Sequence, residues 1–468
     1  MSVATTTADG RVHGAEKHPP GLYVLFATEM WERFAFYSML AMFTLYLQDT
    51  TEGFSWTDAR ATTLYSNYLM FVYFSPLVGG WIADRKLGFR NSVLLGGVFL
   101  GLGNLLIAQG TVPMMYAGIT SMIIGNGFFK PNVSAMVGAL YPEGSHLKDR
   151  AYNIFYMGIN IGAFVAPLVA EAVRQRYGFR EAYFVAAAGM VISIAILWFF
   201  KRHVDHADHR KVVTPTSSVA ATSVDAPPKS VSRQNDALAA VPESRRILAL
   251  IVIFLIVIVF WMVFHQNGST LTYWANDNTD WASSEVLPVI IRILTLGFVS
   301  GEDVSGVISN AINPFWIITL TFPLVWFWKW LDRRGKEPST PAKMAIGMFL
   351  TALSFYILYF AAKAGGDAGK VSPWWLIGAY AVISLGELML SPMGLSLVSK
   401  VAPVRLRGVM MGGWFAATAI GNKLTQIGVF WNVWKHSTFF AVLGSMALVM
   451  AVVLVLLLKP LKKSMPGV

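Results

Sequence analysis

The chain has 468 residues, of which 55% are apolar and 13% are charged, and its mean hydropathy is +0.53. Soluble proteins carry about 25% charged residues, so this composition excludes an ordinary soluble domain and indicates a polytopic membrane protein. The absence of cysteine excludes disulfides and cysteine-bound zinc. The net charge of +11 has the sign of a nucleic-acid-binding protein, but the basic residues are placed as in a membrane topology, and no nucleic-acid partner is expected.

Twelve stretches are long and apolar enough to cross a hydrocarbon core of about 30 Å. The first six are residues 22–47, 60–83, 91–109, 112–139, 151–171 and 181–200, and the second six are 247–272, 307–331, 342–362, 373–399, 406–432 and 437–458. A further apolar run at 286–298 is interrupted by Pro288 and Arg292, and we expect a short interfacial helix there.

These stretches predict an all-α membrane protein with twelve transmembrane helices in two six-helix bundles. The bundles are expected at residues 21–200 and 247–460, joined by a polar linker at 201–246 and flanked by tails at 1–20 and 461–468. Weak internal similarity supports two related halves. Pro76-Leu77-Val78 is followed by Asp84-Arg85, and Pro323-Leu324-Val325 is followed by Asp332-Arg333.

The basic residues predict which side each loop faces. Of the 37 Lys and Arg, 26 fall on the side of the N-terminus, 8 fall on the opposite side and three lie within spans: Arg33, Lys130 and Lys423. Because basic residues concentrate in cytoplasmic loops, we expect both termini in the cytoplasm. The loop that carries Arg174, Arg176 and Arg180 runs against this rule.

The first span contains a cluster of ionisable residues. Glu29, Glu32 and Arg33 fall on one helical face together with Phe36 and Tyr37. A charge at the centre of a span costs roughly 2.5–3.5 kcal/mol on insertion scales, so such residues usually face a protein interior or a wet cavity. The rest of the chain must supply partners for this cluster.

Depth in the membrane identifies candidate partners. At a rise of about 1.5 Å per residue, one set of polar and aromatic residues lies roughly 12–20 Å from the inner face. The set comprises Glu32, Arg33, Tyr73, Lys130, Asn160, Glu387, Trp414 and Thr418. His265 lies closer to the outside, and Asn313 lies near the outer end of its span. Secondary transporters place substrate sites near the midplane, between the two halves.

Each candidate also has a plainer interpretation. Lys130 can extend to the cytoplasmic headgroups, and Asn160 can bond a neighbouring helix. Packing alone explains Tyr73, Trp414 and Thr418, while His265 is compatible with a satisfied polar residue and Asn313 with a helix start. Glu387 differs, because it has no local countercharge. It is expected either to take up a proton or to await a ligand amine.

Several activities are excluded by missing motifs. The chain has no Walker Gly-Lys-Ser/Thr sequence, no nucleophile elbow and no HExxH sequence. We therefore expect neither an ATP-driven motor nor a membrane enzyme, and no cofactor or metal site.

The sequence resembles the proton-dependent oligopeptide transporter family of the major facilitator superfamily. The resemblance rests on several motifs in the expected order. The first span contains E-x-x-E-R-F-x-Y-Y, present as Glu29, Glu32, Arg33, Phe34 and Tyr37. The others are a loop motif at 79–85, F-Y-x-x-I-N-x-G at 155–162, a tenth-span motif at 386–396 and eleventh-span motifs at 411–415 and 421–422. It implies a symporter that imports di- and tripeptides with protons.

The resemblance also implies roles for individual residues. Arg33 and Lys130, with Tyr37, Tyr73 and Asn160, would hold the carboxylate end and backbone of the peptide; Glu387, helped by Asn313, would bind its amino terminus; Trp414 and Thr418 would line side-chain pockets. Glu29 and Glu32 would couple protons, and Glu32 would form an ion pair with Lys130 that breaks on protonation.

Two departures from the family pattern stand out. Phe36 occupies a position where the motif has Tyr, so one hydroxyl contact is lost. His265 occupies the position of a seventh-span Glu that commonly pairs with the first-span Arg at the outer gate. His265 is a candidate alternative proton site because histidine titrates near neutral pH. A cation at this position would repel Arg33.

Two other functions stay open at this point. A related transporter could carry nitrate or another small anion with Arg33 and Lys130, although the complete first-span motif favours peptide. A non-transporting receptor is disfavoured by the two-half architecture with charges at the midplane. The expected location is the inner membrane of a bacterium, and the protein is expected to function as a monomer.

Overall fold

The computed structural model describes residues 18–141, 147–208, 240–300, 304–403 and 406–466. Most of the predicted N-terminal tail and of the predicted linker lies outside these ranges. Within them the chain is helical, and the one β interaction is an isolated bridge between Thr279 and Val371.

The first half of the chain forms one bundle of helices. They are α1 (Pro20–Gln48), α2 (Asp58–Ile82), α3 (Phe89–Ile107), α4 (Val112–Ala139), α5 (Leu147–Tyr177) and α6 (Phe179–Phe199). A π-helical turn, η1 (Ala83–Leu87), follows α2, and two 3-10 turns, η2 (Lys201–His203) and η3 (Asp205–Ala207), follow α6. Each long helix coincides with a predicted span to within a few residues.

The second half forms a second bundle. Its helices are α8 (Glu243–Phe264), α9 (Thr270–Asp277), α10 (Leu287–Leu294), α11 (Ile312–Asp332), α12 (Thr340–Ala364), α13 (Pro373–Val401), α14 (Arg407–Leu424) and α15 (His436–Ser464). The 3-10 segments η4 (His265–Gly268), η5 (Trp281–Ser283), η6 (Gly306–Ala311) and η8 (Thr425–Phe430) lie between them. The short helix expected within residues 286–298 is confirmed by α10.

The seventh predicted span is broken, although the sequence predicts one continuous helix over 247–272. The α-helix ends at Phe264, and the 3-10 turn η4 leads into α9. Gly268 is required in this turn because a Cβ atom there would lie 2.1 Å from the hydroxyl of Tyr65 in α2. The break therefore permits a close approach between the two bundles.

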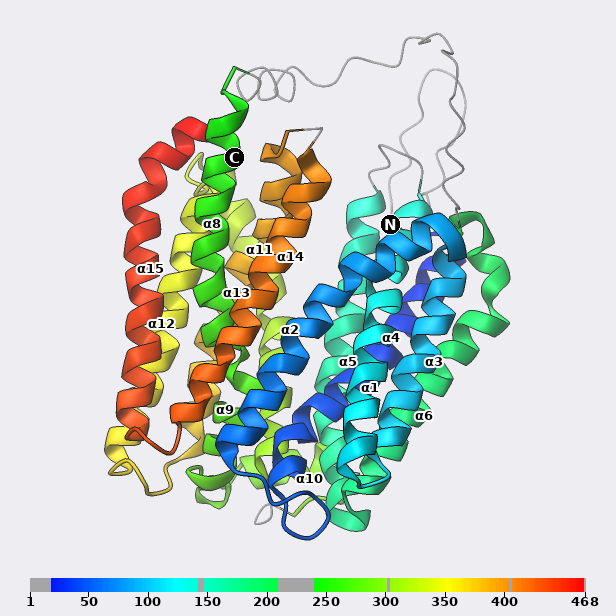
Figure 1. Cartoon of the computed structure of the whole chain (residues 1–468). Helices are drawn as coiled ribbons and strands as arrows, with labels where there is room; N and C mark the ends of the chain where they lie inside the picture. Colours follow the sequence, from blue (N-terminus) through cyan, green and yellow to red (C-terminus); the bar gives the residue numbers. More distant parts are fainter. Residues whose placement is uncertain (1–17, 142–146, 209–239, 301–303, 404–405, 467–468) are drawn as a thin grey trace, which may run out of the picture.

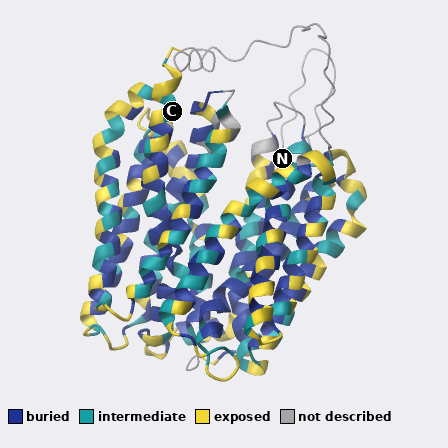
Figure 2. Ribbon diagram, in the orientation of Figure 1, coloured by how far each residue is buried: buried dark blue, intermediate teal, exposed yellow. Residues whose placement is uncertain are grey.

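Nine helical segments of the described chain are long and apolar enough to cross a membrane. The helices α1, α2 and α14 are outside this group because they carry more polar and charged side chains. The position of α1 in the bundle explains how this helix can carry charged side chains. It is buried along most of its length against α5 and α6, as Figure 2 shows, so protein rather than lipid surrounds its charges.

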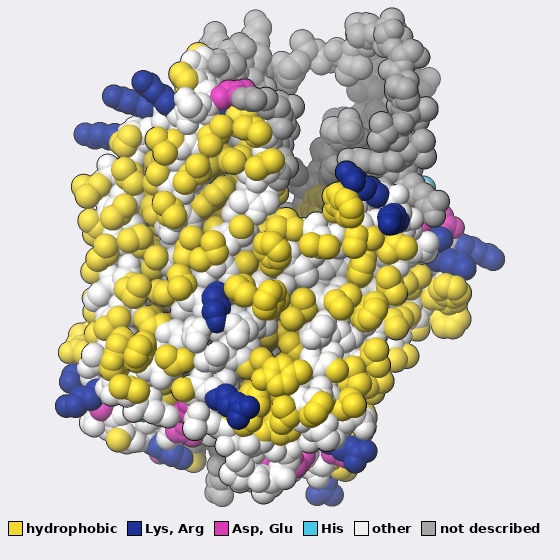
Figure 3. Space-filling model, viewed as in Figure 1, with side chains coloured by type: hydrophobic (Ala, Val, Ile, Leu, Met, Phe, Trp, Pro, Cys, Tyr) yellow, Lys and Arg dark blue, Asp and Glu magenta, His cyan; other side chains and the backbone are white. Residues whose placement is uncertain are grey.

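The two bundles lie side by side, and the described part of the chain begins and ends at one common end (Figure 1). Within the first bundle α3 packs on α4 and α1 packs on α5 and α6; within the second, α12 packs on α13 and α15. Contacts between the bundles join α2 to α14 and η8, and α5 to α11 and η6. Apolar side chains dominate the middle of the surface seen in Figure 3, while Lys and Arg gather mainly near its two ends, as expected for a membrane protein.

The bundles are bonded to each other at the end opposite the termini, which we call the distal end. Among the described residues, every side-chain hydrogen bond between the bundles lies in this half. These bonds join Thr44 to the carbonyl of Gly268, Thr62 to Tyr273, Thr63 to Gln426, Asn67 to Lys423 and Asp58 to Asn432. The structure is therefore closed at the distal end.

Candidate functional site

The ionisable cluster of α1 is paired within its own helix. Arg33 donates to Glu32 through Nε and through Nη2, the latter at 2.7 Å from Oε1. Oε1 of Glu29 lies 3.3 Å from Nε of the same guanidinium. All three side chains are buried, and the guanidinium also lies 4.9 Å from the ring centroid of Phe36. Two-point pairing with a carboxylate suits the planar fork of arginine.

A cavity of about 320 Å³ lies between the bundles. One wall comes from α1, α2, α4 and α5, and the other comes from α8, η4, η6, α11, α13 and α14. The lining includes every predicted site residue except Glu32: Glu29, Arg33, Tyr37, Tyr73, Lys130, Asn160, His265, Asn313, Glu387, Trp414 and Thr418. Glu32 is fully buried and contacts Arg33.

Lys130 presents its ammonium to this cavity. Its Nζ lies 4.6 Å from the ring centroid of Tyr73, a cation–π geometry. The expected ion pair with Glu32 is not formed in this structure: within the described chain, Lys130 has no ion pair, and Glu32 is paired with Arg33. Arg33 is adjacent to Glu32 on the same helix and engages both of its carboxylate oxygens.

Glu387 lies on the opposite wall, in α13. Its carboxylate accepts a hydrogen bond of 3.0 Å from Nδ2 of Asn313, which also donates to Ser384 at 2.9 Å. No basic side chain among the described residues pairs with it. The cavity thus carries an available cation on the first bundle and an available anion on the second.

His265 is surrounded by aromatic rings. Its ring centroid lies 5.1 Å from Trp261, 5.3 Å from Phe264 and 5.8 Å from Tyr73. Nδ1 lies 3.3 Å from the carbonyl oxygen of Trp261. Because a carbonyl only accepts, Nδ1 carries the hydrogen in this contact. Tyr73 therefore contacts both Lys130 and His265.

Other predicted residues bond within their own helices. Asn160 donates to the carbonyl of Tyr156 at 2.9 Å, and the hydroxyl of Thr418 donates to the carbonyl of Trp414 at 3.1 Å. A Cβ atom at Gly394 would lie 1.7 Å from the indole of Trp414. Glycine in the tenth-span motif thus makes room for this aromatic wall.

Sequence reasoning missed part of the lining, notably Trp261, Phe264, Asn267 and Asn310. The polar run Asn267-Gly268-Ser269 inside an apolar span was an available signal for the helix break. The two aromatic residues gave no signal, because aromatic packing residues have the same pattern. Nε1 of Trp261 and Oε2 of Glu29 are buried without a hydrogen-bond partner among the described groups.

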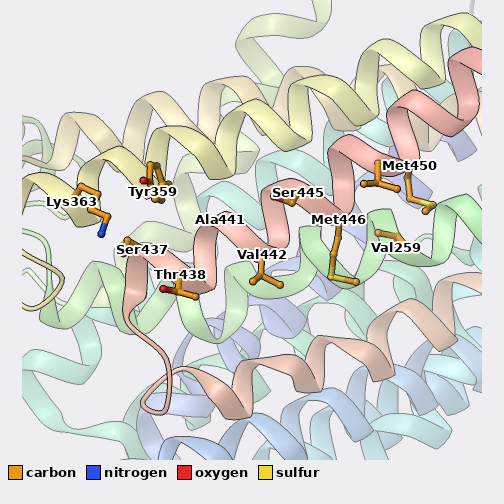
Figure 4. A pocket seen from close by; sticks show the side chains of 11 residues that line it. Val259, Tyr359, Lys363, Ser437, Thr438, Ala441, Val442, Ser445, Met446 and Met450 are labelled. Atoms are coloured by element: carbon orange, nitrogen blue, oxygen red, sulfur yellow. The ribbon is translucent and has the colours of Figure 1, made fainter.

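A second hollow, of about 620 Å³, lies between α12 and α15 beside α8 (Figure 4). Its wall is mainly apolar, with Val442, Met446 and Met450 among the lining residues, and Lys363 lies at one end, 3.8 Å from Asp367. Unlike the cavity between the bundles, it does not bring opposite, unpaired charges together. The cavity between the bundles is therefore the candidate site.

Two helical bundles around a charged cavity form the architecture of a secondary transporter. A family model described as the POT family matches residues 90–236 and 302–452. The chain is 30% identical to the "Uncharacterized transporter YclF" of Bacillus subtilis (96% of each chain covered) and 30% identical to a "Di-/tripeptide transporter" of Lactococcus lactis subsp. cremoris (96% of this chain and 97% of that one).

A solved structure gives the same result. The crystal structure of peptide transporter POT in complex with sulfate superimposes with a TM-score of 0.83 at 27% identity, over 97% of each chain. This chain belongs to the POT family, whose structures have the major facilitator fold. The predicted family and superfamily are thereby confirmed.

The two carboxylates of α1 are predicted to differ in their effect on stability. Glu32→Gln is expected to lower the free energy of unfolding by about 3–5 kcal/mol, because it breaks a buried two-point pair. Glu29→Gln, which removes one contact at 3.3 Å, is expected to cost about 1–2 kcal/mol. Thermal unfolding of the purified protein in detergent measures both, with the exposed Glu285→Gln as a control. Equal losses would contradict the pairing described here.

Proposed function

We propose that this protein is a proton-coupled symporter that imports di- and tripeptides by alternating access. The observation that carries the proposal is the pair of opposite, available charges across one cavity, Lys130 on the first bundle and Glu387 on the second. A short peptide is a zwitterion, so its two ends match these two charges. The Lactococcus relative is a di-/tripeptide transporter, which supports the same substrate class.

Each end of the peptide has a proposed set of contacts. Lys130 binds the carboxylate end, with Tyr37, Tyr73 and Asn160 around it, and Glu387 binds the amino terminus with Asn313 beside it. Trp414 and Thr418 line the space for side chains. The hydrogen bond between Asn313 and Glu387 supports the second set, because it orients the carboxylate while leaving acceptor positions for an ammonium group.

Proton coupling is assigned to Glu29 and Glu32. Both contact the guanidinium of Arg33. Protonating them removes the negative charge that holds Arg33, and the released guanidinium becomes available to the peptide carboxylate. The pairing in this structure leads us to propose Arg33, rather than Lys130, as the group that Glu32 releases.

The proposed topology has twelve transmembrane helices and both termini in the cytoplasm. The proposed bundles are residues 21–200 and 247–460, the linker is 201–246, and the tails are 1–20 and 461–468. The distribution of Lys and Arg supports it. In this orientation the closed distal end faces outward, so the cavity is closed to the outside of the cell. Bacterial relatives support a bacterial inner membrane. One chain supplies both walls of the cavity, which supports a functional monomer.

Uptake by the protein in liposomes tests this proposal. An inward proton gradient is expected to drive accumulation of radiolabelled dialanine above its equilibrium level, because proton entry supplies the energy. Collapse of the gradient with a protonophore is the control and should abolish accumulation. Proton-driven uptake of nitrate without dialanine uptake would identify an anion transporter, and binding without transport would indicate a receptor.

Glu387→Gln is predicted to raise the KM for dialanine about 10- to 100-fold, because a charge-assisted contact to the peptide amine is lost. Ser391→Ala, one turn further along α13 and also in the cavity lining, is the matched control and should change KM little. N-acetyl-dialanine, which lacks the amine charge, should compete weakly with dialanine in the wild type. An unchanged KM in Glu387→Gln would remove this assignment.

His265 is proposed as a second proton site that depends on substrate. Lys130 shares the ring of Tyr73 with it, so a second positive charge is disfavoured until a peptide carboxylate neutralises Lys130. His265 would then take a proton as pH falls, so uptake in the wild type should rise as pH falls. His265→Ala should flatten that rise, while Asn267→Ala, also in the lining, should not. An unaltered profile would leave His265 as part of the wall only.

A further inference from the structure

Lys423 is the third basic residue within the predicted spans, and the peptide site does not use it. It lies in the last turn of α14, and its Nζ donates to Oδ1 of Asn67 in α2 and to Oε1 of Gln426, the latter at 2.5 Å. Both acceptors are neutral amides. Among the described residues, no carboxylate lies within ion-pair distance of this ammonium.

The bonds of Lys423 continue into a chain that joins the two bundles. An ammonium only donates, so the amide oxygens of Asn67 and Gln426 must face it. The amide nitrogen of Gln426 is thereby directed to α2, where it donates to the hydroxyl of Thr63 at 3.3 Å. Thr63 and Asn67 are four residues apart and share one face of α2. The second bundle is thus bonded to two successive turns of the first.

This chain of bonds lies between the cavity and the distal contact. Thr418, which lines the cavity, precedes Lys423 by little more than one turn of α14. On the distal side the bundles pack closely: Thr62 bonds Tyr273 at 3.2 Å, and a Cβ atom at Gly428 would lie 2.9 Å from Cγ2 of Thr62. Lys423 therefore occupies the inner edge of the closed distal end.

We propose that Lys423 is a positioning residue that latches the distal end shut in the conformation seen here. Separation of the bundles removes the bond to Asn67. Bonds from an ammonium to neutral amides are weaker than an ion pair, in which donor and acceptor are both charged. The neutral acceptors therefore permit the latch to release in every cycle.

The natural absence of cysteine makes the latch directly measurable. Thr62→Cys places a single thiol on a fully buried face of the distal contact, where a maleimide reaches it only when that contact opens. The labelling rate of the purified protein reports opening, and the measurement does not require peptide transport. All further changes are made in this background.

Lys423→Met is expected to raise the labelling rate about tenfold, since a charge-assisted bond across the bundles is lost. Asn67→Asp converts the contact to an ion pair and should lower the rate about tenfold. Lys435→Met, which removes an exposed lysine after η8, is the control and should leave the rate unchanged. Lys423→Met without faster labelling overturns the proposal. If Lys423→Met does not fold, the Asn67→Asp variant is sufficient to test the proposal. Unchanged or faster labelling in Asn67→Asp would then overturn the proposal.

Discussion

The requirement that buried charge be neutralised within the membrane governs this structure. Glu29, Glu32 and Arg33 meet it inside one helix, so α1 occupies the interior of its bundle without charged partners from elsewhere. Lys130 and Glu387 are left to face the cavity from opposite walls. In the proposed function, the cost of burying each lone charge favours a zwitterionic ligand that neutralises both. The proposed peptide site and the internal pairing of α1 are two results of one constraint.

Opening and closing of the cavity depend on a different kind of interaction. At the distal end the bundles are joined by hydroxyls, amides and one lysine, with Asp58 as the one carboxylate among the described bonds. Such bonds exchange with water at little net cost. A distal contact held by ion pairs would be harder to open. The inter-bundle bonds thus suit a contact that must form and separate repeatedly, whereas the strong pairing stays within α1.

The sequence predicted the helices and the charged residues of the cavity lining, because both follow from regular geometry. Hydropathy locates spans, and a constant rise per residue places Lys130, Glu387 and Trp414 at one depth. Three features required the structure. The break at Gly268 depends on the approach of Tyr65. The choice of Arg33 over Lys130 as partner of Glu32 depends on side-chain conformation. Trp261 resembles any packed aromatic residue until the cavity beside it is seen.

The interior position of α1 has a consequence for how the protein is made. α1 is buried by α5 and α6, which the ribosome synthesises about a hundred residues later. During this interval the first helix is in the bilayer without the neighbours that will enclose it. Because Glu32 and Arg33 are adjacent and paired, each neutralises the charge of the other when the helix enters the translocon. The ion pair thus lowers the cost of keeping α1 in the bilayer until α5 and α6 are inserted and pack against it.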